Sequence, residues 1–65
     1  MEFGLRLTEA LNGSKYTQNE IAKALGISRS NISNWKNGTN YPSVEMLIKL
    51  CKLLDISADY LLGLD

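Results

Sequence analysis

Short stretches of helical periodicity, each with its own start and stop residues, most constrain how this chain of 65 residues can fold. Apolar residues recur at helical spacing rather than alternating, and no stretch exceeds about three turns. Because helices of this length are marginal alone in water, they must pack on one another around a shared core. The pattern predicts an all-α fold, a compact five-helix domain that takes in residues 1–65 as a single unit.

The first two helices are bounded by recognisable residues. The first is expected over about residues 2–12 and ends at Gly13. Thr17 and Glu20 have the spacing of a capping box, in which each side chain takes the other residue's backbone N–H. They place the second helix at 18–25. The residues expected on the inward faces are Phe3, Leu7, Ala10, Leu11, Ile21, Ala22 and Leu25.

Gly26 follows the second helix and can supply the positive φ of a tight turn. Three further helices are expected over about residues 28–37, 43–54 and 57–63, each opened by a serine that can act as an N-cap. These N-caps are Ser28, Ser43 and Ser57. The inward residues expected on the last two helices are Val44, Leu47, Leu50, Cys51, Leu54, Leu61 and Leu62.

The net charge is zero, but the charge is distributed unevenly along the chain. Residues 13–43 hold four basic side chains against one acidic side chain, a balance of +3. Residues 1–12 sum to −1 and residues 44–65 sum to −2. A basic middle between acidic flanks is the distribution that a one-sided polyanion-binding face needs.

Several chemistries are not expected. With one cysteine and no histidine, the chain has no internal disulfide and no plausible zinc site, and Cys51 is expected to be a small core residue. There is no nucleophile–base pair and no glycine-rich phosphate loop, so we expect no enzyme, no cofactor and no bound metal. No apolar run could cross a bilayer and no charged-then-apolar leader begins the chain, so a cytoplasmic location is expected.

The helix expected over 28–37 has an unusual surface. Ile32 and Trp35 lie about 60° apart around the helix and define its buried face. The other side carries short polar groups and no carboxylate, although serine and asparagine are poor helix formers. Short hydroxyl and amide groups suit close approach to base edges, which indicates a nucleic-acid contact. Tolerated surface polarity is the alternative. The polar residues are Ser30, Ser33, Asn34 and Asn37, with Arg29 and Lys36 on one shoulder.

Ala22, Gly26 and Ile32 have the spacing of a helix-turn-helix over about residues 18–37: a small residue at the helix crossing, a turn glycine and a packing residue. Five strings extend the likeness in order and spacing: FGLRL, TQNEIAKALGIS, ISNWKNG, PSVEMLIKL and DYLLGL. From Phe3 to Leu64 the chain resembles the lambda-repressor-like, Cro/C1-type (XRE) helix-turn-helix family of bacterial and phage regulators. The last string particularly resembles regulators from Gram-positive bacteria and their phages.

The resemblance implies a sequence-specific regulator of transcription that binds double-stranded DNA with helix 28–37 in the major groove, and we expect this regulator to be a repressor. Gln18 would touch phosphate and brace that helix. Many members have glutamate at the position of Lys36, paired with arginine at the position of Leu11; without that pair, we expect Lys36 to face phosphate. The implied base contacts are Ser28, Arg29, Ser30, Ser33 and Asn34. The implied phosphate contacts are Thr17, Gln18, Asn31, Lys36, Thr39 and Asn40.

The expected partner is a pseudo-palindromic DNA operator, bound by a homodimer of the chain. We expect the protein to lie in the bacterial cytoplasm, associated with the nucleoid through DNA. No contact with a membrane and no small-molecule cofactor are expected. Apolar residues beyond the needs of one small core are the candidates for the dimer interface: Met46, Leu53, Tyr60 and Leu64. Ordinary partial exposure of these residues is the alternative. A protein-interaction module, such as an antitoxin or adaptor, remains the alternative function.

Overall fold

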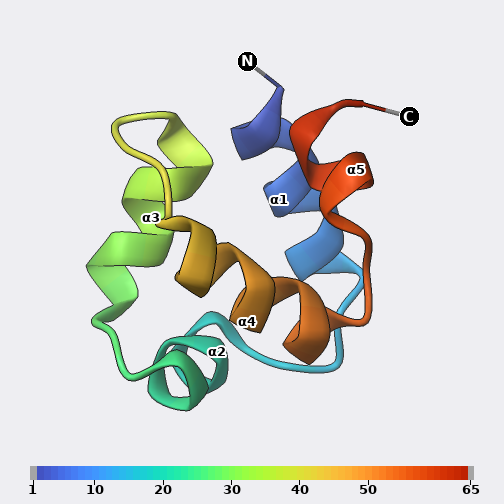
Figure 1. The fold of residues 1–65 in the computed structure, drawn as a ribbon. Helices are drawn as coiled ribbons and strands as arrows, with labels where there is room; N and C mark the ends of the chain where they lie inside the picture. The colour runs from blue at the N-terminus through green and yellow to red at the C-terminus, as the bar shows by residue number, and fades with distance from the viewer. Residues whose placement is uncertain (1, 65) are drawn as a thin grey trace.

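The structure is a computed structural model that describes residues 2–64. Within this range the chain forms five helices and no strand, as Figure 1 shows. The helices are α1 (Phe3–Asn12), α2 (Gln18–Leu25), α3 (Arg29–Asn37), α4 (Val44–Leu54) and α5 (Ala58–Leu62). The predicted all-α class and the five predicted segments are confirmed. None of the helices in the described part of the chain is long and apolar enough to span a membrane.

Side-chain caps define where α2, α4 and α5 begin. At α2 the predicted capping box is present: Thr17 Oγ1 accepts from the Glu20 N–H at 3.1 Å, and a Glu20 carboxylate oxygen accepts from the Thr17 N–H at 2.8 Å. Ser43 and Ser57 cap α4 and α5 in the predicted way, each accepting the N–H three residues on. The start of α2 is therefore fixed by residues that lie outside its apolar face.

Two predicted helix boundaries form differently from expectation. Ser28 occupies the N-cap position of α3, but its side chain makes no capping bond. Its hydroxyl lies 2.8 Å from that of Ser30 instead, and it donates to Asn31 Oδ1 at 3.4 Å. Gly13 does end α1, but with φ −87°, so this position does not require glycine. Gly26 has the predicted left-handed conformation, with φ 72°.

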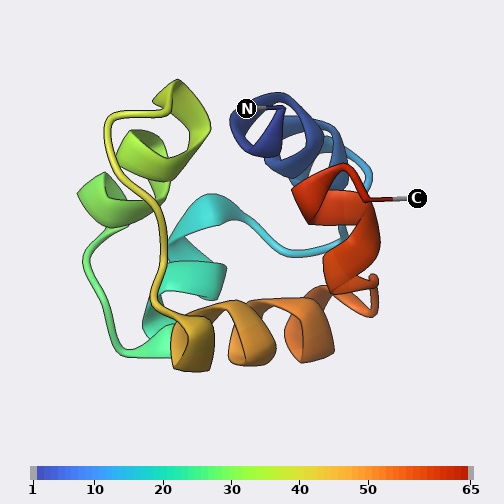
Figure 2. The same ribbon diagram turned by 45° about the horizontal axis from the view of Figure 1, so that its top comes forward.

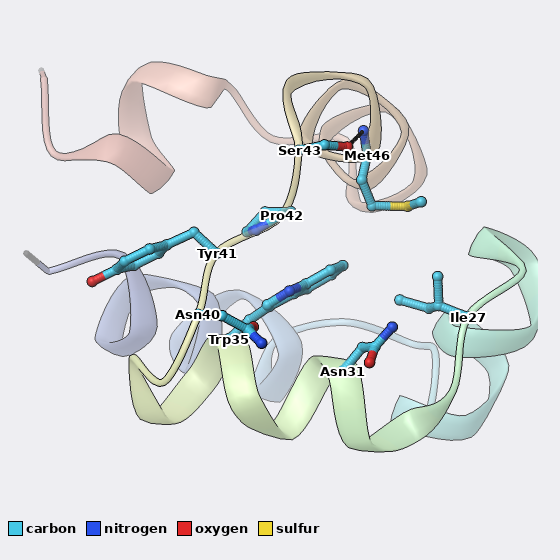
Figure 3. A pocket seen from close by; sticks show the side chains of 8 residues that line it. All are labelled: Ile27, Asn31, Trp35, Asn40, Tyr41, Pro42, Ser43 and Met46. Carbon is cyan, nitrogen blue, oxygen red and sulfur yellow. Dashed lines mark hydrogen bonds between the residues drawn. The ribbon is translucent and has the colours of Figure 1, made fainter.

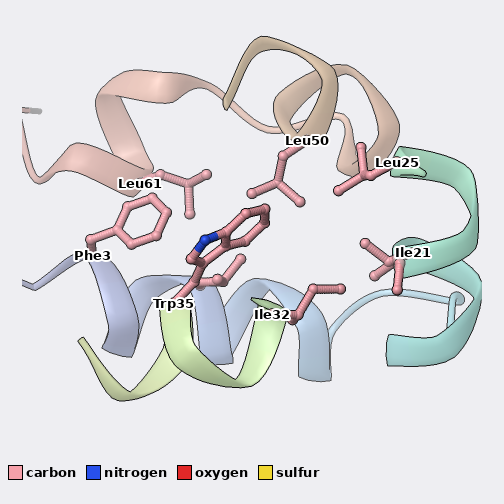
Figure 4. Packing of buried hydrophobic residues seen from close by; sticks show 9 residues of the cluster. Phe3, Ile21, Leu25, Ile32, Trp35, Leu50 and Leu61 are labelled. Carbon is pink, nitrogen blue, oxygen red and sulfur yellow. The ribbon is translucent and has the colours of Figure 1, made fainter. Parts of the chain in front are cut away.

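The core is built from residues of all five helices, and α3 contributes Ile32 and Trp35 to it (Figure 4). Trp35 is only 5% exposed, which confirms its predicted inward orientation. The buried residues are Phe3, Leu7, Ile21, Ala22, Leu25, Ile32, Trp35, Leu50 and Leu61. The predicted residues Ala10, Leu11, Leu47, Cys51, Leu54 and Leu62 are half-buried.

The prediction that Val44 faces inward is wrong, because its side chain is 74% exposed. Val44 is the first residue of α4, and at 100° per residue it lies about 120° around the helix from the buried Leu50. It therefore lies on a shoulder of the helix, and Ile48 one turn further on is also exposed.

The position of α3 depends on a close approach to α1. Gly4 is buried in α1, and a Cβ added there would overlap the carbonyl oxygen of Lys36 near the end of α3. It would also lie 3.2 Å from the Trp35 carbonyl oxygen. Only a residue without a side chain lets the two backbones come this close. Figure 2 shows the result: α3 lies beside α1, and α5 lies on the opposite side of the molecule from α3.

Candidate nucleic-acid interface

The outward side of α3 carries the polar residues that the sequence predicted to contact bases. Ser28, Arg29 and Ser30 are exposed, whereas Ser33 and Asn34 are half-buried. Ile32 and Trp35 hold the opposite side of the helix against the core. Since α3 contains no aspartate or glutamate, its exposed side offers hydrogen-bonding groups and positive charge to a polyanion.

A first hollow of about 410 Å³ lies between the starts of α2 and α3. Its lining joins two predicted phosphate contacts from α2 with two predicted base contacts from α3. The lining residues are Thr17, Gln18, Asn19, Arg29 and Ser33. The structure therefore brings residues of both predicted kinds together, from segments more than ten positions apart in the chain.

Gln18 connects the two helices across this hollow. Its Nε2 group donates to Ser33 Oγ at 2.9 Å and to the Arg29 carbonyl oxygen at 3.3 Å. Its Oε1 atom accepts from Lys36 Nζ at 3.3 Å. The predicted bracing of α3 by Gln18 is confirmed. Lys36 is half-buried and its ammonium group is bonded to Gln18, so it is held beside α2, and its contact with phosphate stays a prediction.

The first turn of α2 adds backbone donors to the hollow. The capping box satisfies the N–H groups of Thr17 and Glu20. The N–H groups of Gln18 and Asn19 have no acceptor among the described residues. Such groups at a helix start favour an anion. Glu20 has the predicted capping role, which fixes one of its carboxylate oxygens on the Thr17 N–H.

A second hollow, of about 330 Å³, lies on the other side of α3, against the segment that leads to α4 (Figure 3). The Asn31 side chain points into it from α3, and Asn40 lines it from the loop. The floor includes the indole of Trp35. Two predicted phosphate contacts thus lie together, separated from the first hollow by the ridge of α3.

Two predicted phosphate contacts, Lys36 and Thr39, line neither hollow. Thr39 is exposed in the loop after α3, and its backbone N–H donates to the Asn34 carbonyl oxygen at 2.9 Å. This bond closes the C-terminal end of α3 together with Gly38, which has φ 76°. Thr39 is therefore held next to the end of the helix with its side chain exposed.

The four candidates for a dimer interface differ in exposure and in the hollows that they line. Met46, Leu53 and Tyr60 are half-buried against the core, and each lines a different hollow. The Tyr60 hydroxyl donates to Glu9 at 2.9 Å, and the Arg6 guanidinium lies 5.2 Å from the centre of its ring. Leu64 alone among the four is largely exposed, at 71%.

Two residues of the site were missed by the sequence analysis. Asn19 lines the first hollow beside Gln18, and its place between the two capping-box residues could have identified it. Gly4 sets the distance between α1 and the end of α3, but a lone glycine near a helix start carries no such signal in sequence. The first omission could therefore have been avoided, whereas the second depends on tertiary packing.

The sequence matches known proteins along most of its length. Residues 7–61 match the family described as Helix-turn-helix. Over 65 residues the chain is 43% identical to the HTH-type transcriptional regulator ImmR of Bacillus subtilis strain 168, covering all of this chain and 51% of that protein. Over 63 residues it is 37% identical to the HTH-type transcriptional activator BcrR of Enterococcus faecalis, covering 97% of this chain and 31% of that protein.

A relative with a different kind of name matches a shorter part. The antitoxin PezA of Streptococcus pneumoniae serotype 4 is 37% identical over 49 residues, which is 75% of this chain and 31% of that protein. The chain thus spans about half or less of the length of these relatives. The resemblance to Cro/C1-type regulators is confirmed by these matches.

Proposed function

The chain belongs to the helix-turn-helix family that it matches over residues 7–61, and from this premise we propose that it binds double-stranded DNA and regulates transcription. The observation that carries the proposal is the outward face of α3, which lacks carboxylates and is braced by Gln18. A helix serving only as solvent-facing surface has no need of such bracing or of residues that lower its helix propensity.

In the proposed complex α3 lies in the major groove, with Ile32 and Trp35 anchoring it to the core. The base contacts come from the outward residues Ser28, Arg29, Ser30, Ser33 and Asn34. Arginine pairs well with guanine, and asparagine with adenine, through two hydrogen bonds each. Arg29 and Asn34 are therefore expected to contribute most of the sequence preference.

Phosphate contacts flank the groove on both sides of α3. On the α2 side we assign them to Thr17, to the backbone N–H of Gln18 and to Lys36. The Lys36 ammonium group has three donors, so it can bond a phosphate while it is bonded to Gln18. On the other side we assign them to Asn31, Thr39 and Asn40. Binding should weaken steeply with added salt, since phosphate contacts release counterions.

We further propose that the chain binds as a homodimer to a pseudo-palindromic operator. The described part of the domain measures 28 × 24 × 22 Å. In such a dimer the two α3 helices must reach successive major-groove faces, which lie ~34 Å apart. We assign this contact to two exposed apolar residues, Leu5 near the start of α1 and Leu64 after α5. Leu5 lies beside Leu62, the last residue of α5.

We propose repression as the outcome, because a domain seated in the major groove can occlude promoter DNA without any further surface. We also propose that the chain acts by binding alone, without catalysis, as its family supports. The location that goes with this function is the bacterial cytoplasm, where operator DNA lies. A promoter–reporter fusion in a bacterial host tests the direction of regulation: reporter output should fall when the chain is expressed.

The test of DNA binding is selection from a randomised duplex pool at about 0.1 M salt, where phosphate contacts are still effective. The triple variant Arg29→Ala, Ser33→Ala and Asn34→Ala is selected in parallel. A two-fold-symmetric motif that the variant loses supports a dimer that contacts bases through α3. If no motif emerges, a covalently linked tandem copy is selected; a motif then indicates weak dimerisation, whereas its absence contradicts DNA binding.

A protein-interaction module is the second candidate function, favoured by the similarity to a protein named as an antitoxin. In that case the exposed apolar residues, such as Val44 and Ile48 on α4, would contact a protein partner. The tandem-copy selection separates the two functions, because a module that binds only protein yields no DNA motif in either form.

A further inference from the structure

We propose that Gln18 fixes the hydroxyl of Ser33 as a hydrogen-bond donor toward DNA, so that Ser33 selects a base with a keto oxygen, guanine or thymine. The inference rests on the proposed function and deepens it. It assigns Gln18 a specificity role that is exerted through Ser33 rather than by contact with a base.

The orientation of the Gln18 amide follows from Lys36. A lysine ammonium group has three donors and no acceptor, so the amide atom that faces it at 3.3 Å must be the oxygen. The nitrogen of the amide then points to α3. Its two hydrogens have two acceptors there, Ser33 Oγ at 2.9 Å and the Arg29 carbonyl oxygen at 3.3 Å. Both hydrogens are therefore used inside the protein.

The Ser33 hydroxyl thus receives a hydrogen bond and still holds its own hydrogen. In many helices a serine or threonine donates this hydrogen to the carbonyl four residues earlier. Thr8 does so in α1, with its hydroxyl 2.8 Å from the Gly4 carbonyl oxygen. The Ser33 hydroxyl makes no such bond, and it donates no hydrogen bond to any of the described residues. Its hydrogen is available to a ligand that enters the first hollow.

Major-groove edges differ in what they offer such a donor. Guanine presents O6 and thymine presents O4, which are acceptors, at the place where cytosine and adenine present amino donors. A hydroxyl that already accepts from Gln18 is best satisfied by giving its hydrogen to the keto oxygen. Facing an amino group, the same hydroxyl would leave its hydrogen without an acceptor, which is unfavourable when water is excluded.

The experiment compares base preferences in duplex selections with the parent chain, Ser33→Ala, Gln18→Glu and Ser30→Ala. The parent should prefer keto over amino bases by about two- to tenfold at one position in each half-site, the ratio expected for one neutral hydrogen bond. Ser33→Ala should abolish that preference and leave the other positions unchanged. Ser30→Ala is the comparison variant, because Ser30 is another proposed base contact on the same helix that Gln18 does not contact. It should change the preference at a different position and retain the keto preference at the position that depends on Ser33.

Gln18→Glu is the decisive variant, because a carboxylate can only accept. The Ser33 hydroxyl should then donate inward to it and expose lone pairs, so the preference at the same position should shift toward cytosine or adenine. The added negative charge lowers affinity for every sequence but does not by itself change which base is preferred at one position.

Three results would overturn the inference: an amino base at the position that Ser33→Ala affects, no position that depends on Ser33, or an unchanged keto preference in Gln18→Glu. Circular dichroism checks that each variant is folded. If Gln18→Glu fails to fold, Gln18→Met provides the same test, since it removes the donor and should reduce the keto preference. Failure of the proposed function is a different result, because the parent chain would then give no motif at all.

Discussion

Replacing Gly4 by alanine should destabilise the domain although alanine is the better helix former. A Cβ at this position would overlap the Lys36 carbonyl oxygen and lie 3.1 Å from its carbonyl carbon. The obstacle is the backbone of α3 rather than a flexible side chain, so α1 must move away from α3 by on the order of 1 Å. A gap of this size removes a substantial part of the van der Waals attraction between the two helices.

The magnitude follows from two opposing effects. Overpacking of this kind is worth up to about 3 kcal/mol of destabilisation, and the gain in helix propensity is at most about 1 kcal/mol. The net loss of about 2 kcal/mol is a large part of the roughly 3–10 kcal/mol expected for a domain of this size. It corresponds to a fall in Tm of about 8–16 °C.

The assay is urea unfolding followed by circular dichroism, with Gly13→Ala as the matched control. An added Cβ at Gly13 would lie 3.6 Å from the nearest atom, an ordinary contact, and its φ of −87° suits alanine. This variant should unfold within about 1 kcal/mol of the parent, on the stabilising side. If Gly4→Ala is as stable as the parent, or Gly13→Ala loses as much, the close approach of α1 and α3 is not what holds them together.

Three further changes test the local structure. Thr17→Ala removes the cap on the Glu20 N–H and should lower stability by about 1 kcal/mol in thermal melts, whereas Thr17→Ser should not. Gly26→Ala meets no atom within 4 Å, so its expected loss of about 1–2 kcal/mol on urea unfolding comes from the positive φ alone, and a neutral result would contradict the turn conformation. Burial raises the pKa of the Cys51 thiol, so the folded state keeps its proton to higher pH than the unfolded chain. The stability difference between the parent and Cys51→Ala should therefore be constant near neutral pH and fall as the pH rises toward about 10; a difference that rises with pH would refute the effect of burial.

The helices were predictable because their ends are encoded locally. The Thr17–Glu20 spacing and the left-handed Gly26 each depend on a few neighbouring residues, and both formed as predicted. Burial was less predictable, because it depends on which elements cover a helix. Val44 begins α4 and is apolar, yet it lies about 120° around the helix from the buried Leu50 and is exposed. Periodicity locates the buried stripe, but it does not show how wide a part of the helix surface the neighbouring elements cover.

The candidate site was predictable in its residues but not in their bonding. Family resemblance identified Gln18 and Ser33 separately, and only the packing of α2 on α3 brings them within 2.9 Å. Ser28 was expected to cap α3, but its hydroxyl is bonded to Ser30 and Asn31. Competition among neighbouring polar groups decides such bonds, and their outcome depends on side-chain geometry that a sequence pattern does not contain.

The same bonding predicts how α3 responds when its outward face is removed. Serine and asparagine lower the helix propensity of α3, so the helix depends on Ile32, Trp35 and the Gln18 brace. In the triple alanine variant at Arg29, Ser33 and Asn34, the higher helix propensity of alanine adds about 0.5 kcal/mol to the free energy of unfolding at each of Ser33 and Asn34. Loss of the Gln18–Ser33 hydrogen bond lowers the same free energy by about 1 kcal/mol. These terms nearly cancel, so the Tm of the variant should lie within about 8 °C of the parent while its DNA motif is lost. A much larger fall in Tm would mean that these side chains hold the fold itself, and the assignment of this face to DNA would then lose its support.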